Sequence, residues 1–298
     1  VKFEHTIFAL PFAYVGALLA QGGLPSAHDL LWVSVAMVGA RSLAMALNRL
    51  IDAGIDARNP RTAGRELPSG ALTAAAVVWF CAASLAVFLV AVWQLDPLVR
   101  WLWPIPVAAF VVYPYLKRFT WLCHLWLGAV DGLAPVGAWA ALRGELPWQA
   151  WALGAAVGAW VAGFDLFYAL LDTAVDRAQG LHSWAVRFGE RGVFTTARLL
   201  HAATVVLLAV AGLGLAAGRR GSLGSFVKQD RRHRRRGLLA LEIPERRSGA
   251  LERAQLGPIA LHALLVVAVA LGVALGLEAC LILALLLASL FYLALLAL

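Results

Sequence analysis

Long apolar segments are the feature that most limits how this chain can fold. A helix needs about 20 consecutive apolar residues to cross the hydrocarbon core of a bilayer, and nine segments of roughly that length can be drawn along the sequence. They cover residues 6–24, 30–50, 72–94, 97–115, 122–142, 147–170, 193–217, 259–277 and 279–298. With 62% hydrophobic and 14% charged residues, the chain is also far more apolar than a soluble domain. We therefore predict an all-α, polytopic membrane protein with about nine transmembrane helices.

Basic residues between these segments predict the orientation of the protein, because cytoplasmic loops carry an excess of Lys and Arg. If the N-terminus is inside, ten of the basic residues before residue 218 fall on the inner side, and two, Arg100 and Arg143, fall on the outer side. The loops after the second, fourth and sixth segments are therefore expected to face the cytoplasm.

One segment departs from this pattern. Residues 218–257 hold eleven basic and four acidic residues, which is a net +7 out of the +8 of the whole chain. The same count of crossings places them outside, where the rule does not expect them. Two explanations stay open: an inserted loop that binds anionic lipid headgroups, and a local shift of the reading frame. A basic run without interleaved aromatic residues is more typical of a solvated face than of a nucleic-acid site, so no nucleic-acid partner is expected.

Two aspartate motifs come at the inner ends of apolar segments. Each is spaced by four residues, which places its members on one face of a helix. The motifs are Asn48, Asp52 and Asp56 in the first and Tyr168, Asp172 and Asp176 in the second, with Asp165 a further turn back. A single motif of this kind is better explained by helix caps and surface salt bridges. Two matched motifs on the same side of the membrane favour a function.

The chemistry that suits such a site is the binding of a diphosphate. Carboxylates that converge repel one another unless a cation neutralises them, and Mg²⁺ prefers carboxylate and phosphate oxygens. Arg and Lys side chains bind the phosphate groups themselves. The basic residues expected at this side are Arg49, Arg58, Arg61, Arg65, Lys117, Arg118 and Arg177. Because the segments below are apolar, the residues suggest a lipid diphosphate held at the cytoplasmic mouth of the bundle.

Arg41 lies deeper, in the middle of the second segment and seven residues before Asn48. A charged side chain in lipid is costly and is expected to face a cavity or a partner. Two readings stay open: Arg41 binds the diphosphate or a carboxylate of a second substrate, or it forms a structural ion pair, for example with Asp131. His182, after the second motif, is a further candidate for contact with substrate.

The sequence resembles the UbiA superfamily of intramembrane prenyltransferases. It is most similar to bacterial 4-hydroxybenzoate polyprenyltransferases and their relatives in menaquinone synthesis. The matching pieces are FEHTIFALPFAY, GARSLAMALNRLIDAGIDARNPRTAGRELPSG, YPYLKRFTWLCHLWLG and DLFYALLDTAVDRAQGLHS. They divide the chain into residues 1–217, which carry the first seven helices and both motifs, the basic polar segment 218–258, and residues 259–298 with the last two helices. The match stops at about residue 217.

The resemblance implies nine helices around a central cavity and transfer of a polyprenyl group from its diphosphate to an aromatic acceptor. It implies Mg²⁺ bound by Asn48, Asp52, Asp56, Asp172 and Asp176, with Lys117 and Arg118 as the basic pair after the fourth segment. Asp165 or Tyr168 would orient the acceptor or take its ring proton. The expected place is a bacterial inner membrane, with 4-hydroxybenzoate as acceptor and quinone synthesis as the pathway.

Two other functions are open alternatives to this one. The first is a prenyltransferase of the same superfamily with a naphthoate, a haem or a glycerol-phosphate lipid as acceptor. The second is an ion-coupled transporter, in which Asp and Arg would act as an ion relay; against it, the motifs lie at the rim and not at the midplane. Prenyl chain length and oligomeric state are not specified by the sequence.

Overall fold

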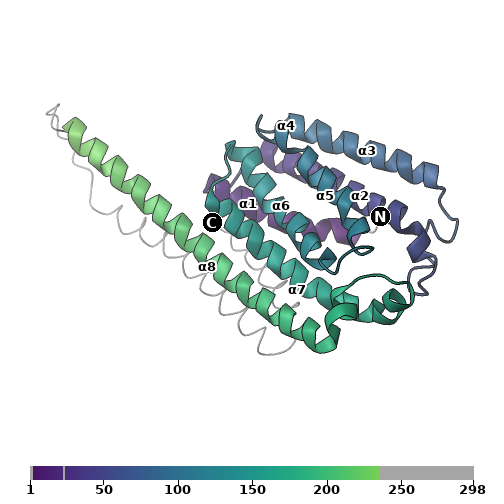
Figure 1. The fold of residues 1–298 in the computed structure, drawn as a ribbon. Coiled ribbons are helices and arrows are strands. Elements are labelled where there is room, and N and C mark those ends of the chain that lie inside the picture. The colour runs from purple at the N-terminus through teal and green to yellow at the C-terminus, as the bar shows by residue number, and fades with distance from the viewer. Residues whose placement is uncertain (1–2, 23, 235–298) are drawn as a thin grey trace. The chain divides into compact units, whose positions relative to one another are not determined.

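The computed structural model describes residues 3–22 and 24–234, and within them every regular element is a helix (Figure 1). In chain order the helices are α1 (Phe3–Gln21), α2 (Ala27–Asp56), α3 (Ala74–Trp93), α4 (Val99–Leu102), α5 (Pro104–Leu116), α6 (Cys123–Arg143), α7 (Trp148–Ala178) and α8 (Trp184–Arg234). The prediction of an all-α chain is confirmed for this part of the protein.

Six spans among the described residues are long and apolar enough to cross a membrane. They are Ala27–Asp56, Ala74–Trp93, Val99–Leu116, Cys123–Arg143, Trp148–Ala178 and Trp184–Leu215. The third combines α4 and α5, and α1, at the first predicted segment, contributes a shorter apolar stretch over Leu10–Gln21. The last two predicted segments, 259–277 and 279–298, lie outside the described residues, so the count of nine stays a prediction.

Local sequence signals explain where several helices begin and end. Ser26 and Thr73 precede α2 and α3, and their hydroxyl oxygens accept hydrogen bonds from the third backbone N–H beyond them, at 3.1 and 3.2 Å. This is the usual way to satisfy free N–H groups at a helix start. At the other end of α6, Gly144 adopts a positive φ of 63°, a conformation that glycine permits without strain and that commonly closes a helix.

Close contact between α6 and α7 depends on glycine. A Cβ added at Gly132 would lie 2.4 Å from the carbonyl oxygen of Gly154, and one at Gly128 would lie 2.2 Å from that of Gly158. These approaches are possible only without side chains, as at many helix crossings in membranes. They fix the register of α6 against α7, and with it the relative positions of the polar side chains that the two helices carry.

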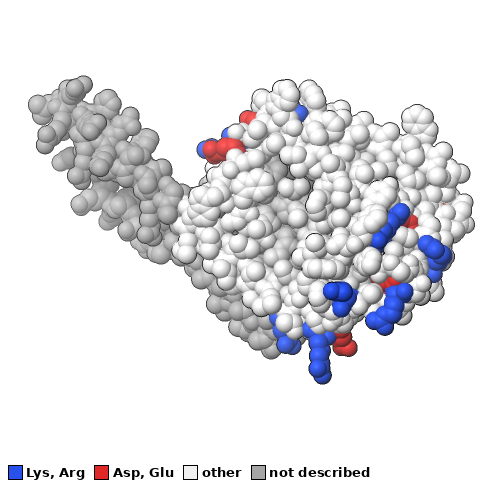
Figure 2. Space-filling model, viewed as in Figure 1, with Lys and Arg blue, Asp and Glu red and all other residues white. Residues whose placement is uncertain are grey.

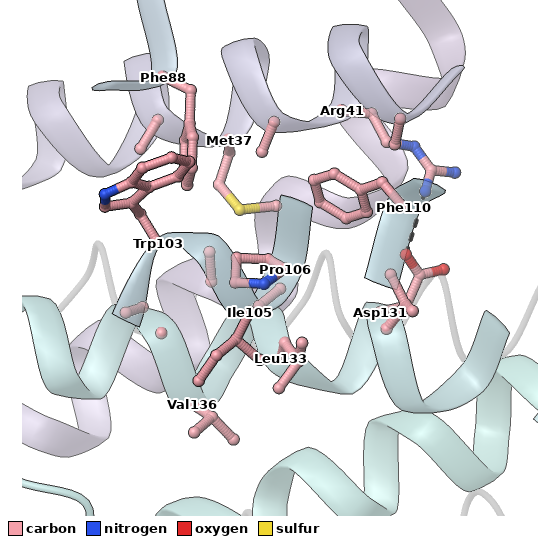
Figure 3. A pocket seen from close by; sticks show the side chains of 18 of the residues that line it. Met37, Arg41, Phe88, Trp103, Ile105, Pro106, Phe110, Asp131, Leu133 and Val136 are labelled. Atoms are coloured by element: carbon pink, nitrogen blue, oxygen red, sulfur yellow. Dashed lines mark hydrogen bonds and ion pairs between the residues drawn. The ribbon is translucent and has the colours of Figure 1, made fainter. Parts of the chain in front are cut away.

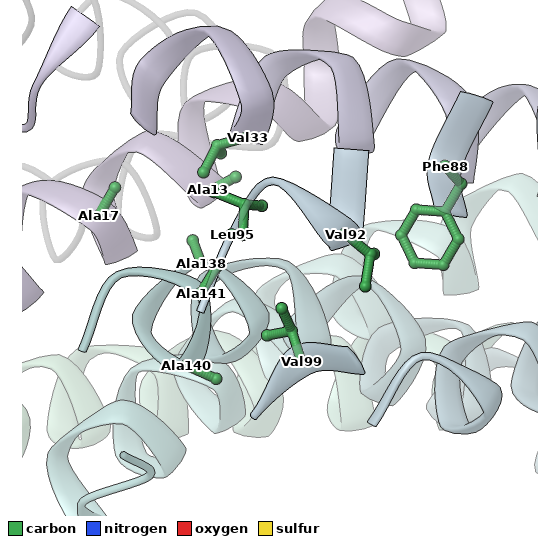
Figure 4. Packing of buried hydrophobic residues seen from close by; sticks show 10 residues of the cluster. All are labelled: Ala13, Ala17, Val33, Phe88, Val92, Leu95, Val99, Ala138, Ala140 and Ala141. Carbon is green, nitrogen blue, oxygen red and sulfur yellow. The ribbon is translucent and has the colours of Figure 1, made fainter. Parts of the chain in front are cut away.

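One cluster of the apolar core lies between α1, α2, α3, α4 and α6, and small residues fill much of it. Figure 4 shows Ala13 and Ala17 of α1 beside Ala138 and Ala141 of α6, and the larger Phe88 of α3 in the same cluster. α3 packs against α2, and α7 packs against α6 (Figure 1).

The described residues divide into two compact units at Thr204. Helices α1–α7 and the first part of α8 belong to the first unit, and the remainder of α8 belongs to the second.

Charged side chains gather at one end of the first unit. Figure 2 shows them at the lower right of the view, a smaller group at the upper left, and an almost uncharged surface between. The larger group includes residues of the segment that links α2 to α3, where Arg58, Arg61 and Glu66 are exposed. On the face that Figure 2 shows, an uncharged band lies between the two charged groups, as a membrane-spanning bundle requires.

Candidate active site

The structure brings the ends of α2 and α7 together through the segment that follows α2. Arg61 of this segment donates its Nε hydrogen to Oδ1 of Asp172 at 2.9 Å and a second hydrogen from Nη2 to Oδ2. Asn59 donates to the same Oδ1 atom at 3.1 Å. A fork of this kind is specific in geometry as well as in charge. Residues of the two motif regions, more than 100 positions apart in the chain, therefore share one site.

The carboxylates of the first motif are buried and each is paired with a base. Asp52 is 2% exposed, and its two oxygens lie 2.6 Å from Nζ of Lys117 and 3.4 Å from Nη2 of Arg118. Asp56 is 6% exposed and lies 2.7 Å from Nη1 of Arg65. The predicted basic pair Lys117 and Arg118 thus meets the first motif directly.

Arg61 marks a point where several negative charges converge. The hydrogen bonds that Arg61 donates to Asp172 raise the pKa of the Arg61 guanidinium above its ordinary value, and the charges of Asp172, Asp56 and Asp176 raise it further. Arg61 is therefore charged at every physiological pH. Three carboxylates from the two motifs act on one cation at this place, which is the electrostatic environment that a bound metal ion would also find.

Below this mouth the structure encloses an apolar cavity of about 570 Å³ (Figure 3). Its wall is mostly apolar, and Figure 3 shows Met37, Phe88, Trp103 and Phe110 among the side chains that line it. The polar residues that also line it are Arg41, Asn48, Arg49, Arg65, Tyr113, Asp131 and Asp165. The cavity thus extends from the basic rim into an apolar interior, as a site for a lipid diphosphate requires.

Two polar pairs lie on or beside the wall of this cavity. Nη1 of Arg41 lies 3.0 Å from Oδ1 of Asp131, and Figure 3 shows the two side chains meeting at one end of the cavity. His124, at the start of α6, lies with Nδ1 2.7 Å from Oδ2 of Asp165 in α7. The pairing of Arg41 with Asp131 is the one that the sequence suggested, and the pair faces the cavity, so the two readings of Arg41 do not exclude each other.

The residues present fit a divalent cation that is shared with a diphosphate. No three His, Cys, Asp or Glu side chains within residues 3–22 and 24–234 are close enough to one another to form a metal site by protein ligands alone. The four motif carboxylates nevertheless supply hard oxygen donors at one mouth, beside a cation that three of them already attract. Mg²⁺ typically takes one or two carboxylates and completes its shell with water and substrate phosphate.

The other predicted residues lie at varied places. Arg49 pairs with Glu66 at 3.1 Å, and Arg58 donates to the carbonyl oxygen of Gly54 at 3.1 Å. Arg177 and His182 are exposed, and the backbone N–H of His182 donates to the carbonyl oxygen of Lys117 at 2.7 Å.

Tyr168 does not line the cavity. It is 55% exposed, and its ring makes an edge contact with Phe164 one turn earlier in α7. Of the two residues expected to orient the acceptor, Asp165 is the one that the structure places at the cavity wall.

Comparison with known proteins agrees with this geometry. The profile of the UbiA prenyltransferase family matches residues 9–228. The chain belongs to the UbiA prenyltransferase family. It is 33% identical to a 4-hydroxybenzoate octaprenyltransferase of Vibrio vulnificus over 230 residues, which cover 74% of this chain and 80% of that protein. A second 4-hydroxybenzoate octaprenyltransferase, from Aromatoleum aromaticum, is 32% identical over 67% of each chain.

Solved structures of UbiA proteins share the fold. The apo structure of a UbiA homolog from Aeropyrum pernix matches with a TM-score of 0.73 and 30% identity, over 97% of this chain and 95% of that one. A UbiA homolog from Archaeoglobus fulgidus bound to GPP and Mg²⁺ matches with a TM-score of 0.58 and 18% identity, over 90% and 96% of the two chains. The protein is therefore a prenyltransferase integral to the membrane, and the UbiA family match extends to residue 228, inside the basic segment.

Sequence reasoning missed three residues of this UbiA site. Asn59 binds Asp172, Tyr113 lines the cavity, and His124 holds Asp165. Asn59 and Tyr113 stand within the pieces that carry the resemblance, beside Arg61 and Lys117, and their polar character there was a signal. His124 is an isolated histidine near a segment end, and only the packing of α6 on α7 reveals its partner.

Proposed function

We propose that this protein transfers a polyprenyl group from its diphosphate to an aromatic acceptor, with Mg²⁺ as cofactor and 4-hydroxybenzoate as the acceptor, in ubiquinone or menaquinone synthesis. The observation that supports this most is the meeting of both aspartate motifs at the mouth of one apolar cavity. A cavity of about 570 Å³ with a basic rim suits a molecule with a diphosphate head and a hydrocarbon chain. Relatives named for this activity are about one third identical to the chain.

Residues at the mouth would bind the diphosphate and stabilise it as a leaving group. We assign Asn48, Asp52, Asp56, Asp172 and Asp176 to the metal; when bound, Mg²⁺ supplies positive charge to the diphosphate oxygens. Arg49, Arg58, Arg61, Arg65, Lys117, Arg118 and Arg177 are assigned to the diphosphate, whose negative charge grows as the allylic C–O bond breaks, and His182 is kept as a substrate contact. Most of these Arg and Lys side chains form ion pairs with carboxylates in the structure. Binding of the diphosphate would replace those carboxylates with phosphate oxygens.

Deeper residues would place the acceptor. Arg41 is the one Arg or Lys that lines the interior of the cavity away from the rim, within the described residues, and it suits the carboxylate of 4-hydroxybenzoate. Asp131 would hold its guanidinium in place between turnovers. The apolar wall excludes water, which would otherwise capture the allylic cation. The attacking atom is the ring carbon ortho to the hydroxyl group. The phenol oxygen raises the electron density at this carbon.

The orientation in the membrane is part of the proposal. We expect the mouth, with its basic side chains, on the cytoplasmic side of a bacterial inner membrane, because cytoplasmic loops carry an excess of Lys and Arg. Tagging the segment between α2 and α3 and the short turn between α6 and α7 with accessible cysteines, followed by labelling in intact cells and in inverted vesicles, would check this. Labelling of the first segment from outside would contradict it.

One experiment tests the proposed reaction. Purified protein is incubated with geranyl diphosphate, Mg²⁺ and a panel of acceptors that includes 4-hydroxybenzoate, 1,4-dihydroxy-2-naphthoate and a glycerol-phosphate lipid, and products are identified by mass spectrometry. We expect a prenylated 4-hydroxybenzoate, no product in EDTA, and recovery when Mg²⁺ is added in excess. A product with another acceptor alone would correct the acceptor, and turnover in EDTA would contradict the role of the metal.

A further inference from the structure

Two carboxylates, Asp131 and Asp165, line the cavity, and they have different partners. Asp131 is neutralised by the guanidinium of Arg41. Asp165 has no Arg or Lys partner among the described residues, and its partner is the imidazole of His124 at 2.7 Å. The four motif carboxylates at the mouth do not line the cavity. Of the two carboxylates that line the cavity, Asp165 is therefore the one that forms no ion pair with Arg or Lys.

His124 is built to hold this carboxylate. The residue is 9% exposed, and it sits in the first turn of α6, on the helix whose register against α7 is set by Gly128 and Gly132. An ionised Asp165 requires that Nδ1 of His124 carries the hydrogen between them. The charge-assisted hydrogen bond offsets part of the cost of an anion inside the bundle. Nε2, the other ring nitrogen, is buried without a hydrogen-bond partner in the structure. The contact of Nδ1 with Asp165 therefore helps to orient the ring.

The position of Asp165 suits a group that acts on the acceptor. It lies seven residues before Asp172 in α7, which corresponds to about 10 Å along the helix axis. The diphosphate would be held at the level of Asp172, and the acceptor ring must lie just beyond the first carbon of the prenyl chain. A carboxylate about two turns below the diphosphate thus faces the region where the ring loses its hydrogen.

We propose that Asp165 is the base that takes the ring proton of the acceptor, and that His124 is the positioning residue that holds the Asp165 carboxylate at the cavity wall. This inference rests on the proposed function and adds to it the last chemical step. The balance is complete: the allylic C–O bond breaks, a ring carbon forms a C–C bond to the prenyl carbon, and diphosphate leaves. The ring C–H bond then breaks, its electron pair restores the aromatic ring, and the proton moves to a carboxylate oxygen of Asp165. Water removes that proton after the product has left.

The test compares variants by rate and by hydrogen isotope effect. Turnover of 4-hydroxybenzoate, or of whichever aromatic acceptor the panel identifies, is measured with ordinary ring hydrogen and with deuterium at the reacting carbon. Asp165→Asn and His124→Leu should lower kcat by about 10²-fold, a typical contribution of a general base, and should raise the isotope effect on kcat because C–H cleavage becomes slower than ionisation. His124→Gln, which keeps a donor for Asp165, should retain most of the wild-type rate.

Two controls separate this role from a structural one. His201→Leu removes another imidazole, which is partly buried and packs beside Gly163 away from the cavity, and it should change neither kcat nor the isotope effect. Mg²⁺-dependent binding of geranyl diphosphate, measured by calorimetry, should be preserved in all variants. An unchanged kcat in Asp165→Asn, or a lower kcat with an unchanged isotope effect in both variants, would overturn the proposal. Absence of prenyl transfer in the wild type would instead contradict the proposed function.

Discussion

The mouth and the interior of the cavity use the same residue types in opposite ways. At the mouth, Arg and Lys side chains reach several carboxylates, and Arg61 and Lys117 are 50% and 28% exposed. In the interior, Arg41 and Asp131 form a single pair with side chains that are 21% and 10% exposed. Ion pairs near water are weak and exchange readily, whereas a buried pair is costly to break.

This difference suits two kinds of binding. A diphosphate that enters the mouth can replace carboxylates as partner of the basic side chains while the carboxylates turn to a metal ion, so most charges stay compensated. An acceptor that enters the interior meets one fixed guanidinium and one uncommitted carboxylate. We therefore expect changes to the exposed pair of Arg61 and Asp172 at the mouth to affect the reaction far more than stability, and changes to the interior pair to affect both.

The largest effect is expected from loss of a motif carboxylate. Asp52→Ala and Asp172→Ala should each lower kcat/KM by about 10³-fold, because each removes a ligand from the diphosphate site and leaves Lys117 or Arg61 without its partner. Both variants should still be inserted in the membrane. Asp172→Ala, whose partner Arg61 is half-exposed, should unfold in detergent within about 1 kcal/mol of the wild type, whereas Asp52→Ala, which removes a buried carboxylate, should cost more. Glu145→Ala, at the other end of α6 and α7, is the control and should be unaffected. Near wild-type transfer in Asp172→Ala would remove the second motif from the mechanism.

The interior pair should show a different response. Arg41→Met alone leaves Asp131 buried without a partner and should destabilise the protein by about 3 kcal/mol. Combining it with Asp131→Leu should recover most of that stability, because two apolar side chains replace two charges. The double variant should still show a strongly raised KM for 4-hydroxybenzoate, with an unchanged KM for the prenyl diphosphate. Normal acceptor KM in the double variant would show that Arg41 has a structural role alone.

The site was predictable where its geometry is local to a helix. The four-residue spacing of Asp52 and Asp56 puts both on one face, and the count of crossings puts the second motif on the same side. The apolar segments alone end at residues 50 and 170, yet α2 and α7 continue to Asp56 and Ala178. The motifs therefore stay helical beyond the apolar stretches, and their spacing retains its meaning.

Contacts between helices were harder to predict. The pair of His124 and Asp165 depends on the register of α6 against α7, which close packing of glycines sets. Nothing in either helix alone specifies that register. For Arg41, a charge in an apolar segment predicts a partner such as Asp131, but the sequence does not distinguish a structural ion pair from a contact with substrate.

The glycine packing predicts a purely structural effect of intermediate size. Gly132→Ala introduces a Cβ 2.4 Å from the carbonyl oxygen of Gly154, so α6 and α7 must separate, at a cost of about 1–3 kcal/mol. Gly137→Ala is the matched control on the same helix, because a Cβ there meets nothing within 4 Å; it should be neutral or stabilise the protein by up to about 1 kcal/mol. Chemical denaturation in detergent measures both. Equal stability of the two variants would argue against the close approach.

The smallest effect is expected for the exposed pair of Arg49 and Glu66. A hydrogen bond to its own backbone, followed by the charge of Arg49, holds the pKa of Glu66 below its ordinary value. A depressed carboxyl pKa stabilises the folded state above the ordinary Glu value of about 4.3, and that contribution is lost as the pH falls through the lower, folded-state pKa. Because the Glu66 side chain is 55% exposed, Glu66→Gln should cost less than about 1 kcal/mol at pH 7 and nothing well below pH 4. Denaturation across pH measures this cost. If the loss of stability in Glu66→Gln persists in acid, packing and not charge is responsible for it. The exposed rim would then depend on packing, as the interior does.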